Sequence, residues 1–369
     1  NIEKNIVEKA FEKGWIKPQV PTTRTGKAVA IVGSGPSGLA AAQQLNRAGH
    51  LVTVFERDAK IGGLLRYGIP DFKLEKSIID RRLKILEEEG IIFHTCKEVG
   101  TDIPVSELEK EFDIILLTGG ATIRRKLPIK GHDLKGVVQA MDFLKHENEV
   151  VDLKIDQQKN YSASSKNVIV IGGGDTGSDC IGTSNRHKAK SVTNFEILDK
   201  PSSERTEENP WPYWPFTLKT SSSHEEGIDR KWSIMTKEFI GDKNKNLTGI
   251  KTVVVDWKKD GDRRKLIEIE GSEKVWPCEL ALLALGFTGP EQDLFSSLNI
   301  DLDQTLKPVT ENYKTTNPKV YAAGDLRRGQ SLIVWAISEG REAAYHIDKQ
   351  LMGNTILPSK IDGDLPSVK

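Results

Sequence analysis

Cysteine is scarce in this sequence, which has three among 369 residues. Cys96, Cys180 and Cys278 are widely separated, and no two of them have the C-x-x-C spacing. This argues against a disulfide scaffold and against a redox-active dithiol. It also argues against an iron–sulfur cluster held by this chain alone, because the usual clusters take four cysteine ligands.

An excess of either charge sign is also missing, because Lys+Arg and Asp+Glu each total 53. The balance gives no electrostatic reason to expect nucleic acid or an anionic membrane as a partner. No apolar run approaches the length of a membrane span, and the N-terminus shows no secretory signal pattern. We therefore predict a cytoplasmic protein that binds neither nucleic acid nor membrane.

Side-chain clusters typical of hydrolases or metalloenzymes do not stand out. The seven histidines are dispersed, and no Ser/His/Asp, Cys/His or metal-ligand arrangement is evident. Each histidine is better explained as a surface or structural residue. The sequence therefore predicts no metal site and no catalytic side chain.

What the sequence does contain is a regular alternation of apolar and amphipathic segments. It runs from Lys27 to about Gly120 and is typical of parallel strands joined by crossover helices. The polar stretch 145–166 separates it from a second alternation, which starts at Asn167 and includes "SVTNFEIL", "GIKTVVVDW" and "CELALLALG". The predicted fold class is α/β.

A glycine-rich turn stands at the start of the first alternation, in "KAVAIVGSGPSGLAAA" (27–42). Gly33, Gly35 and Gly38 have the G-x-G-x-x-G spacing between an apolar strand and a helix, and the next strand, "LVTVFE", ends in Glu56. Such a turn brings backbone N–H groups to a pyrophosphate, and the acid binds a ribose. This combination favours a dinucleotide site over a merely structural turn.

A second turn, in "NVIVIGGGDTGSDCIG" (167–182), repeats the spacing with Gly172, Gly174 and Gly177. We expect no acid at the very end of the following strand, "SVTNFEIL", which runs into "DKPSSER". Lys200 and Arg205 in that segment suit a 2′-phosphate and favour NADPH, with NADH left open. Glu196 blurs this signal, and an ordinary solvated basic loop is the alternative.

Two dinucleotide sites in one chain have a simple chemical explanation. A flavin and a nicotinamide bound by separate domains can exchange a hydride, with the cofactors supplying the chemistry. Such a transfer needs no side-chain acid or base, which agrees with the lack of a catalytic constellation.

Several long segments carry a more specific resemblance. With them the chain resembles the small (β) subunit of NAD(P)H-dependent glutamate synthase, and related architectures occur in dihydropyrimidine dehydrogenase and ferredoxin:NADP transhydrogenases. The segments are "GSGPSGLAAA", "FERDAKIGGLLRYGIPDFKLEK", "GGGDTGSDC", "NPWPYWP", "TSSSHEEG", "LGFTGPEQ" and "AAGDLRRGQSLIVWAISEGREAA".

The resemblance implies two Rossmann-like domains of the pyridine nucleotide-disulfide oxidoreductase type, with the NAD(P)H domain inserted in the FAD domain. The expected order is an N-terminal helix and linker (1–25), the first part of the FAD-binding domain (26–150), the NAD(P)H-binding domain (151–288), the second part of the FAD-binding domain (289–355) and a C-terminal tail (356–369).

The resemblance also assigns residues to each cofactor. For FAD they are Gly33, Gly35, Pro36, Ser37, Gly38, Glu56, Arg57, Gly63, Leu64, Arg66, Val99, Gly120, Gly324, Asp325 and Trp335. For NADPH they are Gly172, Gly174, Asp175, Thr176, Gly177 and Gly286, together with the Lys200 and Arg205 predicted above.

The implied activity is transfer of electrons from NADPH through FAD and iron–sulfur clusters to a glutamate synthase large (α) subunit, for glutamate biosynthesis. Two departures from the family pattern are expected: its N-terminal cysteine-rich domain is lacking, and 118–120 read Thr-Gly-Gly where Ala-Thr-Gly is usual. The alternatives are a free-standing reductase of a ferredoxin-like iron–sulfur protein and a non-catalytic flavoprotein scaffold. The stretch 209–227 has no predicted role beyond a rigid surface loop or a docking surface.

Overall fold

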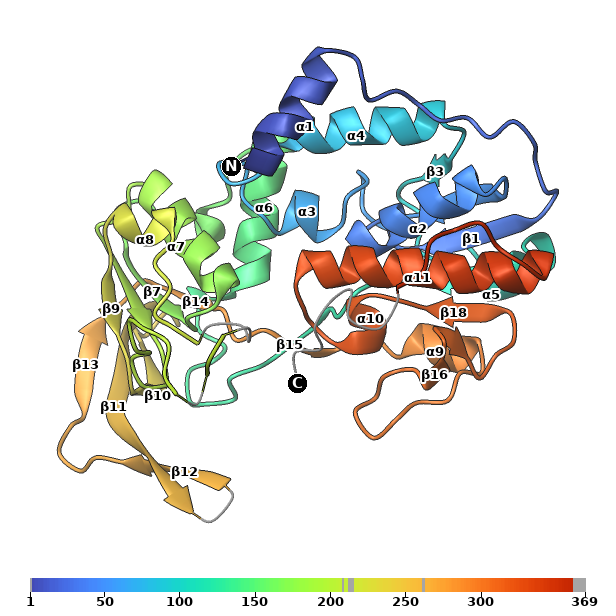
Figure 1. The fold of residues 1–369 in the computed structure, drawn as a ribbon. Coiled ribbons are helices and arrows are strands. Elements are labelled where there is room, and N and C mark those ends of the chain that lie inside the picture. Colours follow the sequence, from blue (N-terminus) through green and yellow to red (C-terminus); the bar gives the residue numbers. More distant parts are fainter. Residues whose placement is uncertain (1, 208, 212–215, 261–262, 361–369) are drawn as a thin grey trace. The chain divides into compact units, whose positions relative to one another are not determined.

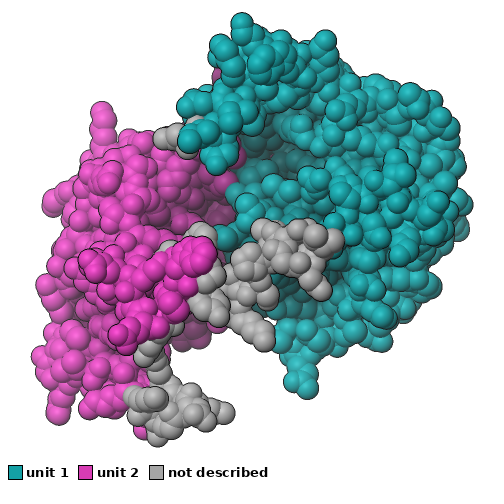
Figure 2. Space-filling view, in the orientation of Figure 1, with its two compact units in different colours: residues 1–66, 75–123, 287–362 teal, residues 67–74, 124–286, 363–369 magenta. Residues whose placement is uncertain are grey.

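The structure is a computed structural model that describes residues 2–207, 209–211, 216–260 and 263–360. The chain divides into two compact units. Unit 1 comprises the described residues up to 66, those from 75 to 123 and those from 287 onward (Figure 2). Unit 2 comprises residues 67–74 and the described residues from 124 to 286. Unit 2 is therefore inserted in the sequence of unit 1.

Unit 1 is built on a seven-stranded sheet in the order β16-β17-β18-β4-β1-β2-β3 (Figure 1). Its apolar strands are buried on both faces, as is usual for parallel strands covered by helices. The parallel strands are β18 (Val320–Ala322), β4 (Ile114–Leu117), β1 (Ala28–Val32), β2 (Leu51–Phe55) and β3 (Ile92–His94). The short strands β16 (Thr310–Glu311) and β17 (Lys314–Thr315) complete one edge in antiparallel pairing.

Two long helices of unit 1, α2 (Pro36–Arg47) and α11 (Ile333–Met352), pack closely together. A Cβ atom at Gly340 would lie 2.1 Å from the Ser37 carbonyl oxygen, so glycine is needed at this crossing. The remaining helices of the unit are α1 (Ile2–Glu12), α3 (Leu64–Tyr67), α4 (Lys76–Glu88), α5 (Val105–Glu111), α9 (Asp293–Ser297) and α10 (Asp325–Arg328).

The N-terminal helix α1 is tied to α4 by one residue. Arg81 donates to both carboxylate oxygens of Glu8 at 2.8 Å, and its guanidinium lies 3.7 Å from the centre of the Phe11 ring. The helix expected within residues 1–25 is therefore present and belongs to unit 1.

Unit 2 is built on a five-stranded parallel sheet in the order β6-β14-β7-β8-β9. Its core contains Phe143, Val168, Val170 and Ile181. The strands are β6 (Val137–Gln139), β14 (Leu280–Leu283), β7 (Asn167–Ile171), β8 (Ser191–Phe195) and β9 (Asp229–Lys231). The helices are α6 (Ala140–Leu153), the short η1 (Lys159–Tyr161), α7 (Asp175–Arg186) and α8 (Ser222–Glu225).

A separate four-stranded antiparallel sheet also belongs to unit 2 (Figure 1). It shows that the expected place of "GIKTVVVDW" in the second parallel alternation is wrong. These residues lie in β11, whose neighbours in the sheet are all antiparallel. The Asp242 carboxylate accepts the Asn244 and Asn246 N–H groups and closes the tight turn that joins β11 to the preceding strand. The strands are β10 (Ile234–Gly241), β11 (Leu247–Asp260), β12 (Arg263–Glu268) and β13 (Lys274–Pro277).

The architecture confirms the predicted α/β class, in which one parallel-sheet unit interrupts another. The unit boundary differs from the expected one, because the chain leaves unit 1 after Ile123 and returns at Phe287. The short strands β5 (Ile123–Arg124) and β15 (Phe287–Gly289) pair at this crossing, and α6 continues across the expected boundary at 150. Within the described residues, no helix is both long and apolar enough to cross a membrane.

Two candidate dinucleotide sites

The glycine turn of unit 1 follows β1 directly. The Gly33 N–H donates to the Phe55 carbonyl oxygen of β2 at 2.9 Å, and Gly33 has a φ of 102°, which L side chains rarely adopt. A Cβ at Gly38 would lie 2.1 Å from the Gly33 oxygen. Both glycines are therefore required by the turn itself, whatever it binds.

Gly35 is different, because no atom of the described residues lies within 4 Å of where its Cβ would be. It is the N-cap of α2, with Pro36 at the first helical position, so the positive end of a twelve-residue helix faces this open space. Open space at a helix N-terminus suits an anion such as a pyrophosphate.

Glu56 braces this turn from the end of β2. The carboxylate is buried, and its Oε2 accepts the Ser34 N–H at 3.0 Å and the Ser34 hydroxyl at 2.5 Å. Its Oε1 accepts the Asp58 N–H at 2.9 Å, and the Ser34 hydroxyl in turn accepts the Gly62 N–H at 2.9 Å. Glu56 could be predicted from the sequence. Ser34 was missed, although its hydroxyl links the glycine turn 33–38 to the segment that contains Gly62 and Gly63.

Ser37 supplies an unpaired polar atom in the same place. Its hydroxyl oxygen is buried and has no hydrogen-bond partner among the described residues. A Cβ at Gly324, whose φ is 75°, would lie 2.8 Å from the Ser37 Cβ, so the "AAGD" segment passes directly over the start of α2. An orphaned hydroxyl beside an open helix N-terminus fits a bound phosphate group.

A buried carboxylate of α11, which was not predicted from the sequence, holds the "AAGD" segment in place. Glu339 accepts the Gly324 N–H at 2.9 Å and the Arg327 Nε–H at 3.0 Å, and it forms a second, shorter contact with the same guanidinium. Burial raises the pKa of the neighbouring Asp325 carboxylate, which accepts the Ser331 hydroxyl at 2.9 Å. No short sequence pattern links residues 324 and 339.

Four other residues predicted to bind FAD differ in how they contact the rest of unit 1. A Cβ at Gly63 would lie 2.9 Å from the Gly35 Cα, which places Gly63 against the turn. Leu64 is 47% exposed, and Val99 forms a bridge with Ile103. Gly120 has a φ of 76° and open space around its missing side chain.

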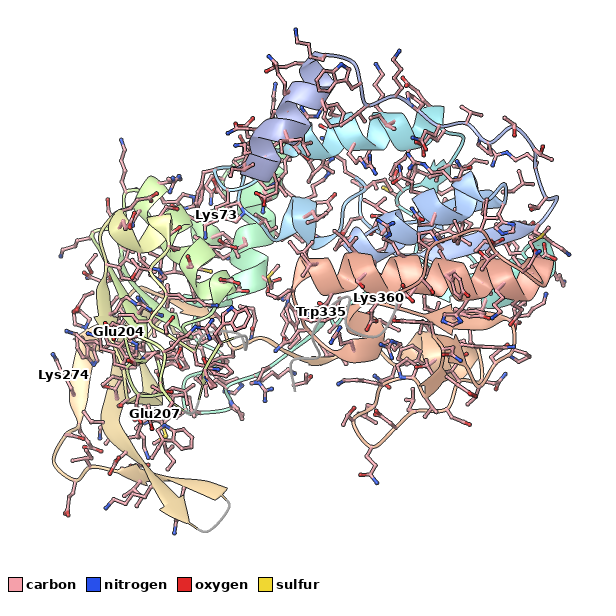
Figure 3. All side chains as sticks on the ribbon, in the orientation of Figure 1. Lys73, Glu204, Glu207, Lys274, Trp335 and Lys360 are labelled. Carbon is pink, nitrogen blue, oxygen red and sulfur yellow. The ribbon has the colours of Figure 1, made fainter. Side chains whose placement is uncertain are left out.

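Three predicted side chains of unit 1 are engaged with protein partners. Arg66 is buried, donates from Nε to the Ile61 oxygen at 2.8 Å and pairs with Asp80. Arg57 pairs with Glu291 at 3.0 Å and with Glu98 at 3.5 Å. The ring of Trp335 is covered by the guanidinium of Arg328 at 4.1 Å and by the Lys360 ammonium at 5.1 Å (Figure 3).

The glycine turn of unit 2 has the same construction. The Gly172 N–H donates to the Phe195 oxygen at 2.9 Å, and a Cβ at Gly172 would lie 2.3 Å from the Ala284 oxygen. A Cβ at Gly177 would lie 2.4 Å from the Gly172 oxygen, whereas one at Gly174 would meet no atom within 4 Å. Gly174 caps α7, whose first residues are the predicted Asp175 and Thr176.

An acid directly follows the strand after this turn, because the strand ends earlier than its sequence pattern predicted. β8 ends at Phe195, which pairs with Ile171, and Glu196 follows at once. The Glu196 N–H donates to the Lys231 oxygen of β9 at 2.9 Å, just as the Glu56 N–H donates to the His94 oxygen of β3 at 2.8 Å. The apolar pattern predicted a strand that continues through Ile197 and Leu198. The strand is shorter because its pairing with β7 ends at Phe195.

The predicted cations of unit 2 lie on the segment that follows β8. Lys200 is exposed, with its ammonium 5.1 Å from the centre of the Trp232 ring. Arg205 donates to the Asn209 oxygen at 3.4 Å. Neither contact brings these side chains to the glycine turn. The predicted Gly286 lies at the end of unit 2 and accepts the Arg125 N–H at 3.0 Å.

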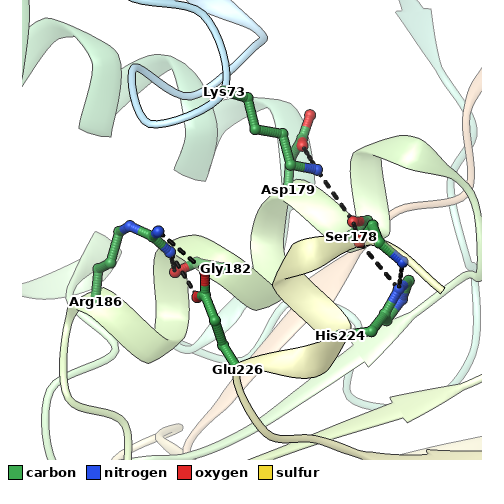
Figure 4. Close-up of polar contacts among 8 residues, drawn as sticks. Lys73, Ser178, Asp179, Gly182, Arg186, His224 and Glu226 are labelled. Carbon is green, nitrogen blue, oxygen red and sulfur yellow. Dashed lines mark hydrogen bonds and ion pairs between the residues drawn. The ribbon is translucent and has the colours of Figure 1, made fainter. Parts of the chain in front are cut away.

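A polar network joins α7 to the segment 67–74 and to α8 (Figure 4). Lys73 pairs with Asp179 at 2.5 Å and donates to the Ser178 hydroxyl at 3.1 Å. The Ser178 and Ser221 hydroxyls are 2.6 Å apart, and Ser221 forms a capping box with His224. Burial, assisted by the charges of Arg230 and Lys73, lowers the pKa of His224 to about 4.

This network gives a structural role to part of the stretch 209–227. "SSSHEEG" contains Ser221 and His224, which cap the N-terminus of α8. The sequence alone does not show this role, because it depends on which residues the two side chains contact. Residues 212–215 of "NPWPYWP" lie outside the described part of the chain. Cys180 and Cys278 are buried, and burial raises the pKa of the Cys278 thiol to about 12, so these thiols are core residues.

Comparison with known proteins places this double site in a family. The pyridine nucleotide-disulphide oxidoreductases match residues 27–340. A glutamate synthase [NADPH] small chain from Bacillus subtilis is 47% identical over 367 residues, which cover 97% of this chain and 74% of that relative. The chain belongs to the glutamate synthase small-chain family. It is an FAD-dependent NAD(P)H oxidoreductase, and the predicted resemblance is confirmed.

Another relative and two solved structures also resemble this chain. A glutamate synthase [NADH] from Schizosaccharomyces pombe is 47% identical over 377 residues, which cover 99% of this chain but 18% of that relative. The solved structure of Mycobacterium tuberculosis FprA in complex with NADPH has a TM-score of 0.69 and 17% identity, covering 89% of this chain and 85% of FprA. A thioredoxin reductase from T. acidophilum has a TM-score of 0.61 and 19% identity, covering 87% and 97% of the respective chains. These two structures confirm the predicted fold type.

Proposed function

We propose that unit 1 binds FAD, that unit 2 binds a nicotinamide nucleotide, and that the chain feeds electrons toward a glutamate synthase large subunit. The repeated strand, glycine turn and helix carry this proposal. In both units one glycine of the turn faces open space at a helix N-terminus, while the glycines on either side are packed against backbone.

Unit 1 fits FAD at its phosphates. The orphaned Ser37 hydroxyl, the open face of Gly35 and the N-terminus of α2 would hold the pyrophosphate. Gly324 and Asp325, held by Glu339, would lie beside it. Bound FAD would supply the hydride-accepting chemistry, and the protein would supply its position and electrostatics.

Unit 2 fits the second dinucleotide in the same way. Gly174 and the N-terminus of α7 would hold its pyrophosphate, while Gly172 and Gly177 keep the turn tight. Hydride transfer between the two cofactors would need no side-chain acid or base, because the cofactors would supply the chemistry.

The electron acceptor is inferred from the relatives. The Bacillus relative is named a small chain of glutamate synthase, and the match covers 74% of its length. We propose that electrons pass from FAD through iron–sulfur clusters that this chain does not hold alone to the large subunit, in glutamate biosynthesis. A cytoplasmic location and the absence of nucleic-acid and membrane partners remain predictions.

Anaerobic mixing tests the proposal. The purified chain should contain one FAD, and a nicotinamide nucleotide should bleach its visible absorbance. The chain should then reduce ferricyanide but form no glutamate from glutamine and 2-oxoglutarate. A flavin that stays oxidised would support a non-catalytic scaffold. Rapid reduction of a ferredoxin in the absence of a large subunit would support a free-standing reductase.

A further inference from the structure

Residues 67–74, here called the strap, belong to unit 2, although the residues on both sides of them belong to unit 1. The strap connects α3 with the start of α4. It holds its own turn, because the N–H groups of Lys73 and Leu74 both donate to the Pro70 oxygen, at 2.9 and 3.1 Å. The strap is therefore a preformed loop that leaves one unit of the chain and packs as part of the other.

Lys73 fastens the strap to α7. Its ammonium pairs with the Asp179 carboxylate at 2.5 Å and donates to the Ser178 hydroxyl at 3.1 Å (Figure 4). The side chains of Lys73 and Asp179 are 25% and 12% exposed, so solvent screens this pair less than it screens a surface pair. Removing one partner would leave the other charge partly buried, which favours release of the strap.

An aromatic contact fastens the strap to the same helix. The guanidinium of Arg186 lies 3.5 Å from the centre of the Phe72 ring. A Cβ at Gly182 would lie 2.7 Å from the Phe72 Cζ, so the glycine makes room for the ring. Ser178, Gly182 and Arg186 have the i, i+4, i+8 spacing and so share one side of α7. Two neighbouring side chains of the strap are thus fitted to one side of this helix.

The strap joins segments that lie at the two glycine turns. In unit 1, α3 directly follows Gly63, where a Cβ would lie 2.9 Å from the Gly35 Cα of the first turn. In unit 2, α7 begins directly after Gly174 of the second turn, and Ser178 and Asp179 lie in the first two turns of this helix. The strap is therefore a short covalent link between elements of both proposed nucleotide sites.

We propose that the strap is a tether that positions unit 2 for reduction of the flavin, and that Lys73 is the positioning residue that holds the tether on α7. This inference rests on the proposed function of the two units. Hydride transfer depends steeply on the distance and alignment of the reacting atoms. A strap released from α7 would therefore slow the transfer while both cofactors stay bound.

Anaerobic stopped-flow reduction of the bound flavin, with NADPH and with NADH, tests the role of Lys73. Lys73→Met removes the charge but keeps an unbranched side chain. It should lower the rate constant at saturating nucleotide about tenfold, while the FAD content and the Kd of the nucleotide change by less than about twofold. Lys73→Arg should restore most of the rate. Lys237→Met is the matched control, because it breaks another 2.5 Å pair of unit 2, with Glu268, and it should leave the rate constant unchanged.

Hydrogen exchange followed by mass spectrometry examines the strap without turnover. The backbone amides of residues 67–74 should exchange about fivefold faster or more in Lys73→Met than in the unaltered chain, because the strap has lost an attachment. Lys237→Met should leave this exchange unchanged. Asp179→Asn removes the same ion pair from the α7 side and should reproduce both effects, which keeps the test decisive if Lys73→Met fails to fold.

The outcomes separate this inference from the proposed function. If neither nucleotide reduces the flavin of the unaltered chain, the proposed function fails and the role of the strap fails with it. If the unaltered flavin is reduced, an unchanged rate constant in Lys73→Met refutes the tether and leaves the function standing. A lower rate constant with unchanged exchange of residues 67–74 would also refute the tether, as would a loss confined to the Kd of the nucleotide.

Discussion

The two glycine turns share a backbone and differ at the residue after the first glycine, Ser34 in unit 1 and Gly173 in unit 2. With serine, the acid at the end of the next strand becomes part of the internal frame, because it accepts both the N–H and the hydroxyl of that residue. With glycine, the corresponding acid, Glu196, accepts the Leu198 N–H with one oxygen, and its other oxygen has no hydrogen-bond donor among the described residues. One repeated scaffold thus gives this acid different hydrogen-bond partners in the two units.

The largest effects should come from filling the packed glycines of each turn. Gly38→Ala and Gly177→Ala place a methyl group 2.1 and 2.4 Å from a backbone oxygen. We expect a loss of at least about 3 kcal/mol in the free energy of unfolding of the affected unit, since backbone must move. Urea unfolding with a fluorescence readout measures it. Variants as stable as the unaltered chain would show that glycine is not required at these two positions.

Removing the Ser34 hydroxyl should have the next largest effect. Ser34→Ala leaves the buried Glu56 with one donor fewer and deprives the Gly62 N–H of its acceptor. The expected loss is about 1–3 kcal/mol of unfolding free energy, with weaker retention of FAD. Ser164→Ala, at an exposed serine of unit 2, is the control. Equal stability of both variants would mean that Glu56 does not brace the turn.

The His224 cap should make unit 2 sensitive to acid. Its pKa falls from 6.5 to about 4 on folding, so the folded unit disfavours the imidazolium ion. The stability that this neutral histidine contributes is therefore fully present above pH 6.5 and is lost as the pH falls toward 4. Solvent screens this partly exposed group, so the change should be smaller than that of Ser34→Ala. Thermal unfolding of His224→Gln at several pH values should show a flatter profile, and an unchanged profile would contradict this role.

The smallest effect is expected from the two cations first considered for the 2′-phosphate. Replacing Lys200 and Arg205 together by alanine should leave the ratio of kcat/KM for NADH to kcat/KM for NADPH nearly unchanged, because Lys200 lies over the Trp232 ring and Arg205 donates to the Asn209 oxygen. The ferricyanide assay measures this ratio for the double variant and the unaltered chain. A fall in kcat/KM for NADPH alone would return the choice of coenzyme to this basic segment.

The glycine turns could be predicted from sequence because a fixed spacing marks them. Gly38 and Gly177 are required by a contact within the turn, with the Gly33 and Gly172 oxygens, whereas Gly33 and Gly172 also pack against the distant backbone of Thr118 and Ala284. The α/β class followed from the alternation of apolar segments in the same way. Family resemblance then supplied the insertion of one unit in the other.

Features that depend on distant residues could not be predicted in this way. The end of β8 is set by its pairing with β7, so the sequence did not show that Glu196 directly follows the strand. Glu339 reaches Gly324 across fifteen residues, and Arg66 finds its partners Ile61 and Asp80 only in the folded unit. The antiparallel pairing of β11 likewise depends on turns and partner strands rather than on its own pattern.

The two turns are proposed to hold different cofactors, FAD in unit 1 and a nicotinamide nucleotide in unit 2. Gly35→Ala and Gly174→Ala test this central claim, because each adds a methyl group where no protein atom lies within 4 Å. The measurement is the FAD released per chain, quantified by mass spectrometry for the two variants. We predict a full complement of FAD in Gly174→Ala and a clear deficit in Gly35→Ala. A deficit in Gly174→Ala with full FAD in Gly35→Ala would contradict the assignment.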